Sequence, residues 1–375
     1  MKKVILLALA GILLVGACKN DDDDTGCPTC PVANDDIDGP YNPVAYTLEA
    51  PSWFGDPNQY VPADNPMTVD GIALGRMLFY DPILSSDSTM SCSSCHEAAK
   101  GFADGLATST GVLGITGNRS SMPLINLVYN TKGFFWDGRS NSLEAQAIAP
   151  IEDHRELNEN WENVVEKLRN HPDYPQLFRK AFGIDKRSKI NKELATMAIA
   201  QFERTLISAN SRFDRVVWLN EGWATDSEQR GRELFFVEFA EPGITHPGCS
   251  HCHGSYLYTE NNYFNNGIED AEVFEDFPDA GLGGVTNVLY DTGKFRAPTL
   301  RNIALTAPYM HDGRFQTLEE VLDHYASGGH GFLNEDANIQ QFILSEQDKI
   351  DMINFLNMLT DTSFVNNPAF QNPFN

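Results

Sequence analysis

The feature that most constrains this chain is a short motif of two cysteines and a histidine, which occurs twice. The residues are Cys92, Cys95 and His96 in the first motif and Cys249, Cys252 and His253 in the second. In Cys-x-x-Cys-His, each thiol can form a thioether to a haem vinyl group, and the adjacent imidazole then reaches the iron as proximal ligand. A zinc site or a disulfide is the alternative, but an exported chain has few other uses for this motif. The pair therefore predicts two covalent c-type haems.

The beginning of the chain is typical of a bacterial lipoprotein signal peptide. Two lysines precede an apolar run from Val4 to Val15, and small residues precede Cys18. The run is shorter than the roughly 20 residues that a membrane-spanning helix needs. We expect residues 1–18 to be the signal peptide, Cys18 to carry the lipid, and residues 19–60 to form an acidic tether and surface wrap. The predicted location is the cell envelope, periplasmic or on the outer-membrane surface, with membrane contact only through the lipid anchor.

The charge of the chain limits its partners. The formal net charge is −25 at pH 7, which argues against binding to nucleic acid or to an anionic membrane. A basic redox protein would be steered toward such a surface, although an acidic periplasmic protein needs no such partner. Cys27 and Cys30 have Pro31 where a haem motif needs histidine, so we expect a local disulfide or two idle thiols there.

Helical periodicity and capping signals predict a mostly α fold. Apolar residues recur at helical spacing from Thr68 to Tyr80, over residues 161–168 and over residues 194–206. Further helices are expected to start at Thr225, Thr317 and Ser345, the first two of which open capping boxes. No stretch alternates convincingly as a strand.

The order of elements suggests two domains. A helix, a cysteine motif, a loop and further helices follow one another twice, with long loops expected at residues 101–133 and 260–293. We therefore expect two cytochrome c-like domains with long loops, at residues 61–215 and 216–375, each carrying one covalent haem.

Four more stretches carry a family resemblance. They are residues 74–79 (LGRMLF), 135–139 (FWDGR), 297–302 (APTLRN) and 307–313 (APYMHDG). With the two cysteine motifs, they make roughly residues 65–360 similar to the bacterial dihaem cytochrome c peroxidase family, including its MauG-type branch. The resemblance implies that the N-terminal haem meets peroxide, that the C-terminal haem relays electrons, and that a tryptophan lies between them.

Three residues match the catalytic positions of that family. Trp136 matches the inter-haem tryptophan, and Gln146 and Glu156, ten and twenty positions further on, match the glutamine and glutamate of the distal pocket. Cleavage of peroxide needs a proton moved from one oxygen to the other, which a carboxylate above the iron can do. The alternatives are that Glu156 lies on a solvated charged run and that Trp136 fills the core.

Two departures from the peroxidase pattern concern the iron ligands. Residues 97–135 contain no histidine, so we expect the first iron to keep an open position. Tyr325 stands at the position where the resemblance implies a methionine ligand to the second iron in the peroxidases and a tyrosine in the MauG branch. A phenolate ligand favours Fe(III). A core aromatic is the alternative for Tyr325, Met310 is a competing ligand, and His324 is expected on the surface.

The resemblance also implies roles for residues around the haems. His311 would bond a haem propionate or brace the domain interface. A calcium ion would be held by the backbone carbonyls of Thr306 and Pro308 and by the side chain of Ser121, where the family usually has asparagine.

The resulting hypothesis is a hydrogen-peroxide-dependent oxidoreductase of the cytochrome c peroxidase type. Peroxide is reduced at the N-terminal haem, and electrons from a cytochrome c or another redox protein arrive through the C-terminal haem. The first alternative is a MauG-like enzyme that oxidises side chains of a partner protein. The second is a non-enzymatic surface electron carrier, which would need two six-coordinate irons.

Overall fold

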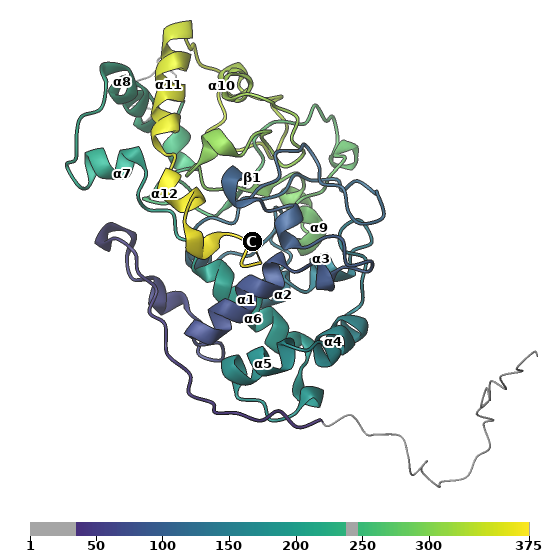
Figure 1. The fold of residues 1–375 in the computed structure, drawn as a ribbon. Helices are drawn as coiled ribbons and strands as arrows, with labels where there is room; N and C mark the ends of the chain where they lie inside the picture. Colours follow the sequence, from purple (N-terminus) through teal and green to yellow (C-terminus); the bar gives the residue numbers. More distant parts are fainter. Residues whose placement is uncertain (1–34, 238–246, 375) are drawn as a thin grey trace, which may run out of the picture. The chain divides into compact units, whose positions relative to one another are not determined.

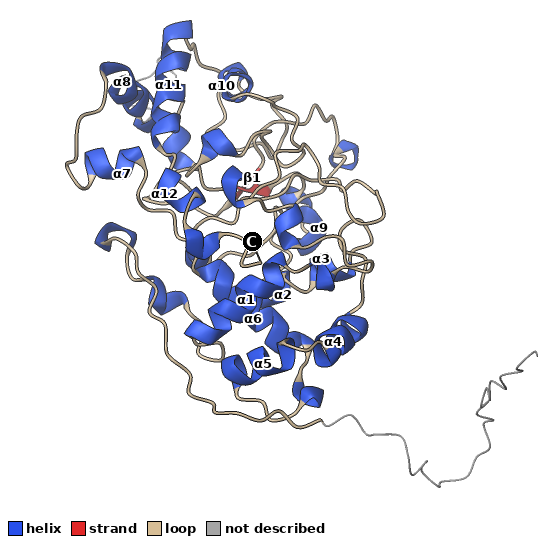
Figure 2. Cartoon of the chain, viewed as in Figure 1, coloured by secondary structure: helices blue, strands red, loops and turns tan. Residues whose placement is uncertain are grey.

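Twelve α-helices and one small sheet make up the regular structure of the residues that the computed structural model describes, 35–237 and 247–374 (Figure 1 and Figure 2). The helices before the second cysteine motif are α1 Val69–Tyr80, α2 Leu143–Gln146, α3 Ala149–Glu152, α4 Trp161–Asn170, α5 Tyr174–Phe182, α6 Lys192–Arg204, α7 Arg212–Val217 and α8 Asp226–Phe236. Those after it are α9 Gly283–Thr286, α10 Leu318–Ser327, α11 Glu346–Met358 and α12 Thr362–Val365. Strands β1 Tyr263–Phe264 and β2 Phe295–Arg296 pair antiparallel. The predicted mostly α fold is confirmed.

The predicted helix starts are set by local hydrogen bonds. The Thr68 hydroxyl accepts from the Gly71 N–H at the start of α1. Complete capping boxes open α8 at Thr225, α10 at Thr317 and α11 at Ser345. These side chains satisfy backbone N–H groups that a helix start otherwise leaves without partners.

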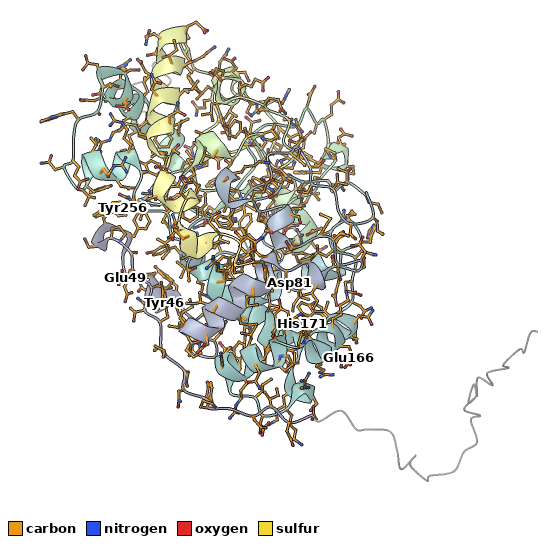
Figure 3. All side chains as sticks on the ribbon, in the orientation of Figure 1. Tyr46, Glu49, Asp81, Glu166, His171 and Tyr256 are labelled. Carbon is orange, nitrogen blue, oxygen red and sulfur yellow. The ribbon has the colours of Figure 1, made fainter. Side chains whose placement is uncertain are left out.

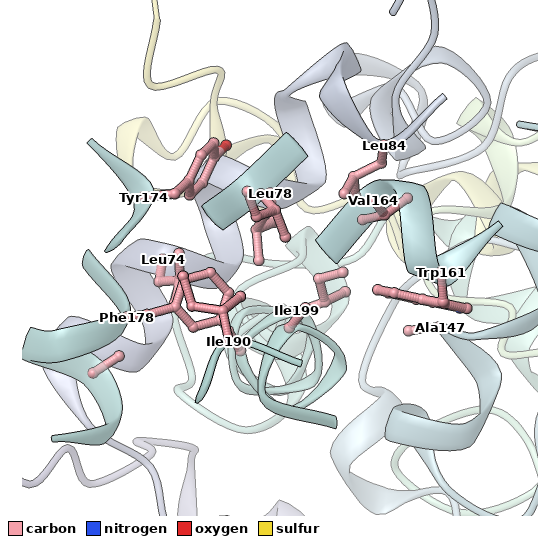
Figure 4. Close-up of a cluster of buried hydrophobic side chains, with 14 of the residues drawn as sticks. Leu74, Leu78, Leu84, Ala147, Trp161, Val164, Tyr174, Phe178, Ile190 and Ile199 are labelled. Atoms are coloured by element: carbon pink, nitrogen blue, oxygen red, sulfur yellow. The ribbon is translucent and has the colours of Figure 1, made fainter. Parts of the chain in front are cut away.

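The first half of the chain is built around the pair α1 and α6. The apolar face of α1 packs against α5 and α6, and Figure 4 shows the shared core, in which Leu74 and Leu78 of α1 are fully buried. Gly75 allows the close approach, because a Cβ there would lie 1.8 Å from the Ala198 carbonyl oxygen of α6. Asp81, labelled in Figure 3 just after α1, accepts a hydrogen bond of 2.6 Å from the Tyr174 hydroxyl of α5.

The second half repeats this arrangement with α8 and α11. A Cβ at Gly231 of α8 would lie 1.9 Å from the Asp351 carbonyl oxygen of α11. Residues 75–79 read GRMLF and residues 231–235 read GRELF, so the same pattern stands in both helices that precede a cysteine motif. Each motif therefore follows a helix with a closely packed glycine, which supports the predicted repetition of elements.

The two long loops differ from each other. Within residues 101–133 the structure has only the 3₁₀ turn Leu127–Tyr129, as predicted. Within residues 260–293 it has β1, α9 and two 3₁₀ turns, Phe274–Asp276 and Leu289–Asp291, so the loop prediction is wrong in part. Two-residue strands are too short to show the alternation that identifies a strand in sequence.

Segments distant in sequence join the two halves. Phe364 and Phe370 lie in the core that surrounds Phe79 and Phe102, and the Tyr80 hydroxyl donates to the Phe370 carbonyl at 2.6 Å. Residues Asp36–Asn375 form one compact unit by their contacts, and the division at residue 215 stays a prediction.

The N-terminal segment also reaches the second half. The ring of Trp53 stacks on Trp218 at 5.9 Å, and Trp218 lies 5.3 Å from Tyr256, which is labelled in Figure 3. The Arg301 guanidinium lies 4.6 Å from the centre of the Phe54 ring. Residues 52–54 therefore pack as part of the folded unit.

Candidate functional site

The first cysteine motif forms a single tight turn. Cys92–Ser94 is a 3₁₀ turn, and the backbone N–H groups of Cys95 and His96 both donate to the Cys92 carbonyl. Both cysteines are half-buried free thiols. One turn therefore presents two thiols and an imidazole together, which is the donor set of a c-type haem.

The His96 imidazole is oriented by the backbone. Its Nδ1 lies 2.8 Å from the Phe102 carbonyl oxygen, and because a carbonyl only accepts, Nδ1 carries the proton. Burial lowers the pKa of His96, so the ring is neutral at pH 7. Nε2 keeps its lone pair, which is the state that a metal-binding imidazole needs.

The second motif repeats this geometry. Cys249–His251 is a 3₁₀ turn, and Cys249 and Cys252 are free thiols. The His253 Nδ1 lies 3.1 Å from the Pro298 carbonyl and 3.3 Å from the Tyr258 carbonyl. Burial lowers the pKa of His253 to about 4. The two motifs thus present the same set of donors.

A cavity of about 190 Å³ opens beside the second motif, and we call it the His253 cavity. A water molecule needs only about 10–15 Å³, so the space suits a much larger group. Its wall is mainly apolar and includes Leu318, Leu322, Met352 and Leu356. Free thiols, an oriented imidazole and an apolar cavity fit a covalent haem at this site.

Tyr325 and Met310 both line the His253 cavity, as the competing ligand predictions require. The Asn266 side-chain amide lies 3.5 Å from the Tyr325 hydroxyl and 3.3 Å from the Met310 sulfur. Burial raises the pKa of Tyr325 to about 12. His324 is half-buried and hydrogen-bonds the Asn266 carbonyl at 2.9 Å, so its predicted surface position is wrong. A contact from outside the helix holds the His324 ring, and helical spacing alone gives no sign of it.

Trp136 belongs to the first half of the chain but lines the His253 cavity. Its indole N–H donates to the Ser120 carbonyl at 2.9 Å. The neighbouring Ser121 hydroxyl donates to the Cys95 carbonyl at 2.5 Å and lies 3.4 Å from the His96 Nδ1. A short connected path therefore leads from the first motif to the wall of the second site.

His311 is a buried wall residue of the same cavity. Its ring stacks on Phe295 at 3.7 Å with an interplanar angle of 12°. Burial lowers the pKa of His311 to about 4, so the imidazole is neutral. Its backbone carbonyl accepts from the Ser120 N–H, which connects the two halves of the chain.

Glu156 and Gln146 lie in the first half, both half-buried, with Gln146 at the end of α2. Burial raises the pKa of Glu156, and the Asp153 carboxylate adds to that effect. Burial raises the pKa of Cys95 to about 11, and the Glu156 charge contributes to that rise. The Glu156 carboxylate therefore lies close enough to Cys95 for its charge to affect that thiol, and its role in a distal pocket stays a prediction.

The predicted calcium residues, Ser121, Thr306 and Pro308, all line the His253 cavity. In the described part of the chain, one other group of carboxylates and histidine lies close enough for a metal: Glu269, His311 and Asp312. The Arg314 guanidinium forms ion pairs with both of its carboxylates. That group is therefore balanced by a protein cation, and it differs from the predicted site.

Two buried residues near the motifs are not among the site residues predicted from the sequence. Arg296 lines the His253 cavity, and Glu203 of α6 is buried with Oε2 lacking a hydrogen-bond partner. Burial raises the pKa of Glu203 to about 8. Arg296 directly precedes the APTLRN stretch, which is the only sequence signal that could have drawn attention to it.

The fold and the site together define a mostly helical protein with two cytochrome c-type attachment turns. A family model described as Di-haem cytochrome c peroxidase matches residues 69–221. The chain is 36% identical over 303 residues to the methylamine utilization protein MauG of Methylorubrum extorquens, covering 80% of each chain. It is 34% identical over 268 residues to the cytochrome c551 peroxidase of Nitrosomonas europaea, covering 72% of this chain and 76% of that one.

The chain therefore belongs to the di-haem cytochrome c peroxidase family. The solved structure of a MauG-like protein associated with microbial copper homeostasis has a TM-score of 0.80 and 33% identity, covering 88% of this chain and all of that one. The predicted family and the predicted peroxidase-type oxidoreductase are confirmed, and the cofactor of the family is haem c.

Cys18, the predicted site of lipid attachment, lies outside the described residues, as do Cys27 and Cys30. Across residues 35–237 and 247–374, no helix combines the length and the apolar character needed to cross a membrane.

Proposed function

We propose that this protein reduces hydrogen peroxide at a haem held by His96 and receives the electrons through a haem held by His253. The position of Trp136 carries the proposal. Its indole lines the His253 cavity and is hydrogen-bonded to Ser120, whose neighbour Ser121 contacts the first motif. An aromatic ring in that position provides a route for electrons between two redox groups.

The haems, when bound, supply irons that coordinate peroxide and exchange electrons with it. His96 offers Nε2 to the first iron, and Cys92 and Cys95 offer the thioether sulfurs. The loop of residues 97–135 brings no imidazole to the opposite side, since it contains no histidine. A haem iron held by His96 would then have a position free for peroxide.

Glu156 is the proposed acid–base group. Its pKa lies above the usual carboxyl range because it is buried, so it exchanges protons closer to neutral pH. With a haem held by His96, the Glu156 carboxylate would move a proton from one peroxide oxygen to the other, and the second oxygen would leave as water when the haem supplies the electrons. Gln146 holds the bound oxygen through its neutral amide.

At the second site, His253 and Tyr325 are the proposed ligands. Burial raises the pKa of this tyrosine to about 12, and the positive charge of a ferric iron bound there would favour the phenolate. Met310 is the competing ligand. Thr306, Pro308 and Ser121 are the proposed calcium residues.

A second function is favoured by a specific observation. The MauG relative is 36% identical, and Tyr325, which the family resemblance matches to the tyrosine ligand of the MauG branch, lines the His253 cavity. The protein would then oxidise side chains of a partner protein, whose electrons would enter through the second haem and reduce peroxide at the first.

The proposed location is the cell envelope, where a lipid on Cys18 holds the protein at a membrane on the periplasmic or outer surface. The net charge of −25 supports a basic cytochrome or another basic redox protein as the donor. Metabolic labelling with a radioactive fatty acid, compared between the natural chain and Cys18→Ser, tests the anchor, and label retained in the variant excludes it.

Stopped-flow spectroscopy of the as-isolated ferric protein mixed with peroxide tests the function. We expect a high-spin ferric signal at rest, a reaction without prior reduction, and rapid turnover with reduced cytochrome c. Slow turnover with a long-lived oxidised state would favour the protein-oxidising function. A fully low-spin protein that does not react with peroxide would indicate an electron carrier and overturn both enzymatic functions.

A further inference from the structure

Arg296 of β2 is a buried cation at the junction of the two cysteine motifs. It is 5% exposed and lines the His253 cavity. Its backbone N–H donates to the Trp136 carbonyl at 2.8 Å. Two residues later, the Pro298 carbonyl accepts from the His253 ring. Arg296 is therefore connected both to the tryptophan between the motifs and to the segment that orients the second histidine.

The partners of the Arg296 guanidinium in the described structure are neutral. Nη1 donates to the Asn261 side-chain oxygen at 3.0 Å, and Nε donates to the Phe135 carbonyl at 3.5 Å. Nη2 lies 3.6 Å from the Met122 sulfur, which is a weak acceptor. A guanidinium has five N–H donors, so these contacts leave donors available and the positive charge unbalanced.

The two other most buried arginines of the described chain are paired differently. Arg204, 4% exposed, forms an ion pair of 2.8 Å with Glu144. Arg301, fully buried, forms a bidentate pair with Asp214 at 2.7 and 2.9 Å. Burial of a charge without a counter-ion costs several kcal/mol. Among the described residues no carboxylate bonds the Arg296 guanidinium, so an anionic group that enters the His253 cavity would meet an unbalanced cation.

Arg296 stays positively charged at neutral pH. Burial lowers its pKa to about 10, which is still well above 7. The cavity thus has a permanent cation in a wall that is otherwise mainly apolar. It also contains the thiols and the imidazole that suit a c-type haem, and a haem carries two propionate carboxylates.

We propose that Arg296 binds a propionate of the second haem and so fixes the edge of that haem next to Trp136. The inference rests on the proposed function only in that it requires a haem at the second motif. A charge-assisted bond to a guanidinium is among the stronger hydrogen bonds in proteins, and its planar fork fits a carboxylate.

The pairing has a consequence for the redox properties of the site. A buried cation close to a haem disfavours the ferric state, which carries one more positive charge than the ferrous state. Loss of the Arg296 charge should therefore lower the midpoint potential of the second haem. We expect about a tenfold change in the reduction equilibrium, which is ~59 mV for a one-electron couple.

The test is spectroelectrochemical titration of the holoprotein with both haems loaded, comparing the natural chain with Arg296→Gln and Arg296→Lys. We expect the potential of the second haem to fall in Arg296→Gln and to return most of the way in Arg296→Lys. Arg230→Gln is the control for loss of one arginine charge, because the Arg230 side chain is 53% exposed and lies outside the His253 cavity wall. A shift confined to the first haem would overturn the assignment to the second.

If Arg296→Gln does not fold or does not load haem, a second measurement still tests the proposal. Resonance Raman spectra of the natural chain and Arg296→Lys should then differ in the propionate bending band, because a lysine replaces the fork by a single donor. Unchanged bands and unchanged potentials would overturn the proposal. Neither measurement uses peroxide, so failure here together with normal peroxide turnover would leave the proposed function intact.

Discussion

Glu156 illustrates how burial changes the chemistry of one residue within a charged run. Glu152 and His154 of the same run are exposed, whereas Glu156 is half-buried. Its pKa is raised by burial and by Asp153, while Arg139 and Arg155 oppose that rise. The family resemblance singles out Glu156 from this run, and the fold adds the burial that distinguishes it from Glu152.

We expect Glu156→Gln to lower the rate of peroxide reduction by about 10²–10⁴, the usual contribution of a positioned acid–base group. The reason is that glutamine cannot carry the proton between the two oxygens. Stopped-flow kinetics measure the loss, and Glu152→Gln is the matched control on an exposed neighbour. Equal rates in both variants would remove Glu156 from the reaction.

Glu203 predicts a pH dependence of stability. Burial raises its pKa to about 8, so the folded protein keeps a proton that the unfolded chain releases above about 4.5. The free energy of unfolding should therefore fall as the pH rises from about 5 to 8. Urea unfolding of the holoprotein at several pH values should show this decline, and Glu203→Gln should flatten it. The same decline in both proteins would exclude Glu203 as its cause.

At the scale of elements, local sequence signals predict where helices start, whereas contacts between distant segments cannot be predicted from them. The helix starts at Thr225 and Thr317 were predictable because capping boxes involve residues only three apart. The pairing of β1 with β2 and the bond that holds His324 join segments far apart in sequence. A single sequence carries no sign of such pairings.

The residues of the candidate site also divide into those that the sequence predicts and those that only the fold reveals. The two haem-binding turns follow from contiguous residues, and the family resemblance supplied Trp136, Gln146 and Glu156. Arg296 could not be predicted from the sequence. It stands out because it is buried without a carboxylate partner among the described residues, and only the folded chain shows this.

The glycine of α1 allows a test of helix packing. A Cβ at Gly75 would lie 1.8 Å from the Ala198 carbonyl, so Gly75→Ala must push α1 and α6 apart. We expect a loss of about 1–3 kcal/mol or more, as for overpacked cores. Thermal unfolding of the variant and the natural chain measures this loss of stability. Gly284→Ala, where the nearest atom is 3.6 Å away, should change the melting temperature little. Equal melting temperatures for the two variants would contradict the packing argument.

At the scale of the whole molecule, function depends on communication between the two motifs. We expect Trp136→Phe to slow multiple-turnover peroxide reduction about tenfold or more, about 1.4 kcal/mol in barrier, while the first reaction with peroxide is retained. Comparing the single-turnover rate with the steady-state rate checks this. Trp218→Phe is the control, because Trp218 is exposed and lies outside the His253 cavity wall. A parallel loss of both rates would instead assign Trp136 to the peroxide step.

The core around Phe79 and Phe102 contains Phe364 and Phe370, which are synthesised after both cysteine motifs. The Tyr80 hydroxyl and the Arg76 side chain also bond backbone carbonyls of residues 368–371. The surroundings of the first attachment turn therefore cannot close until residues 364–371 have joined the fold. The thiols of that turn, although they come early in the chain, stay accessible for haem attachment until the end of the chain has folded against them.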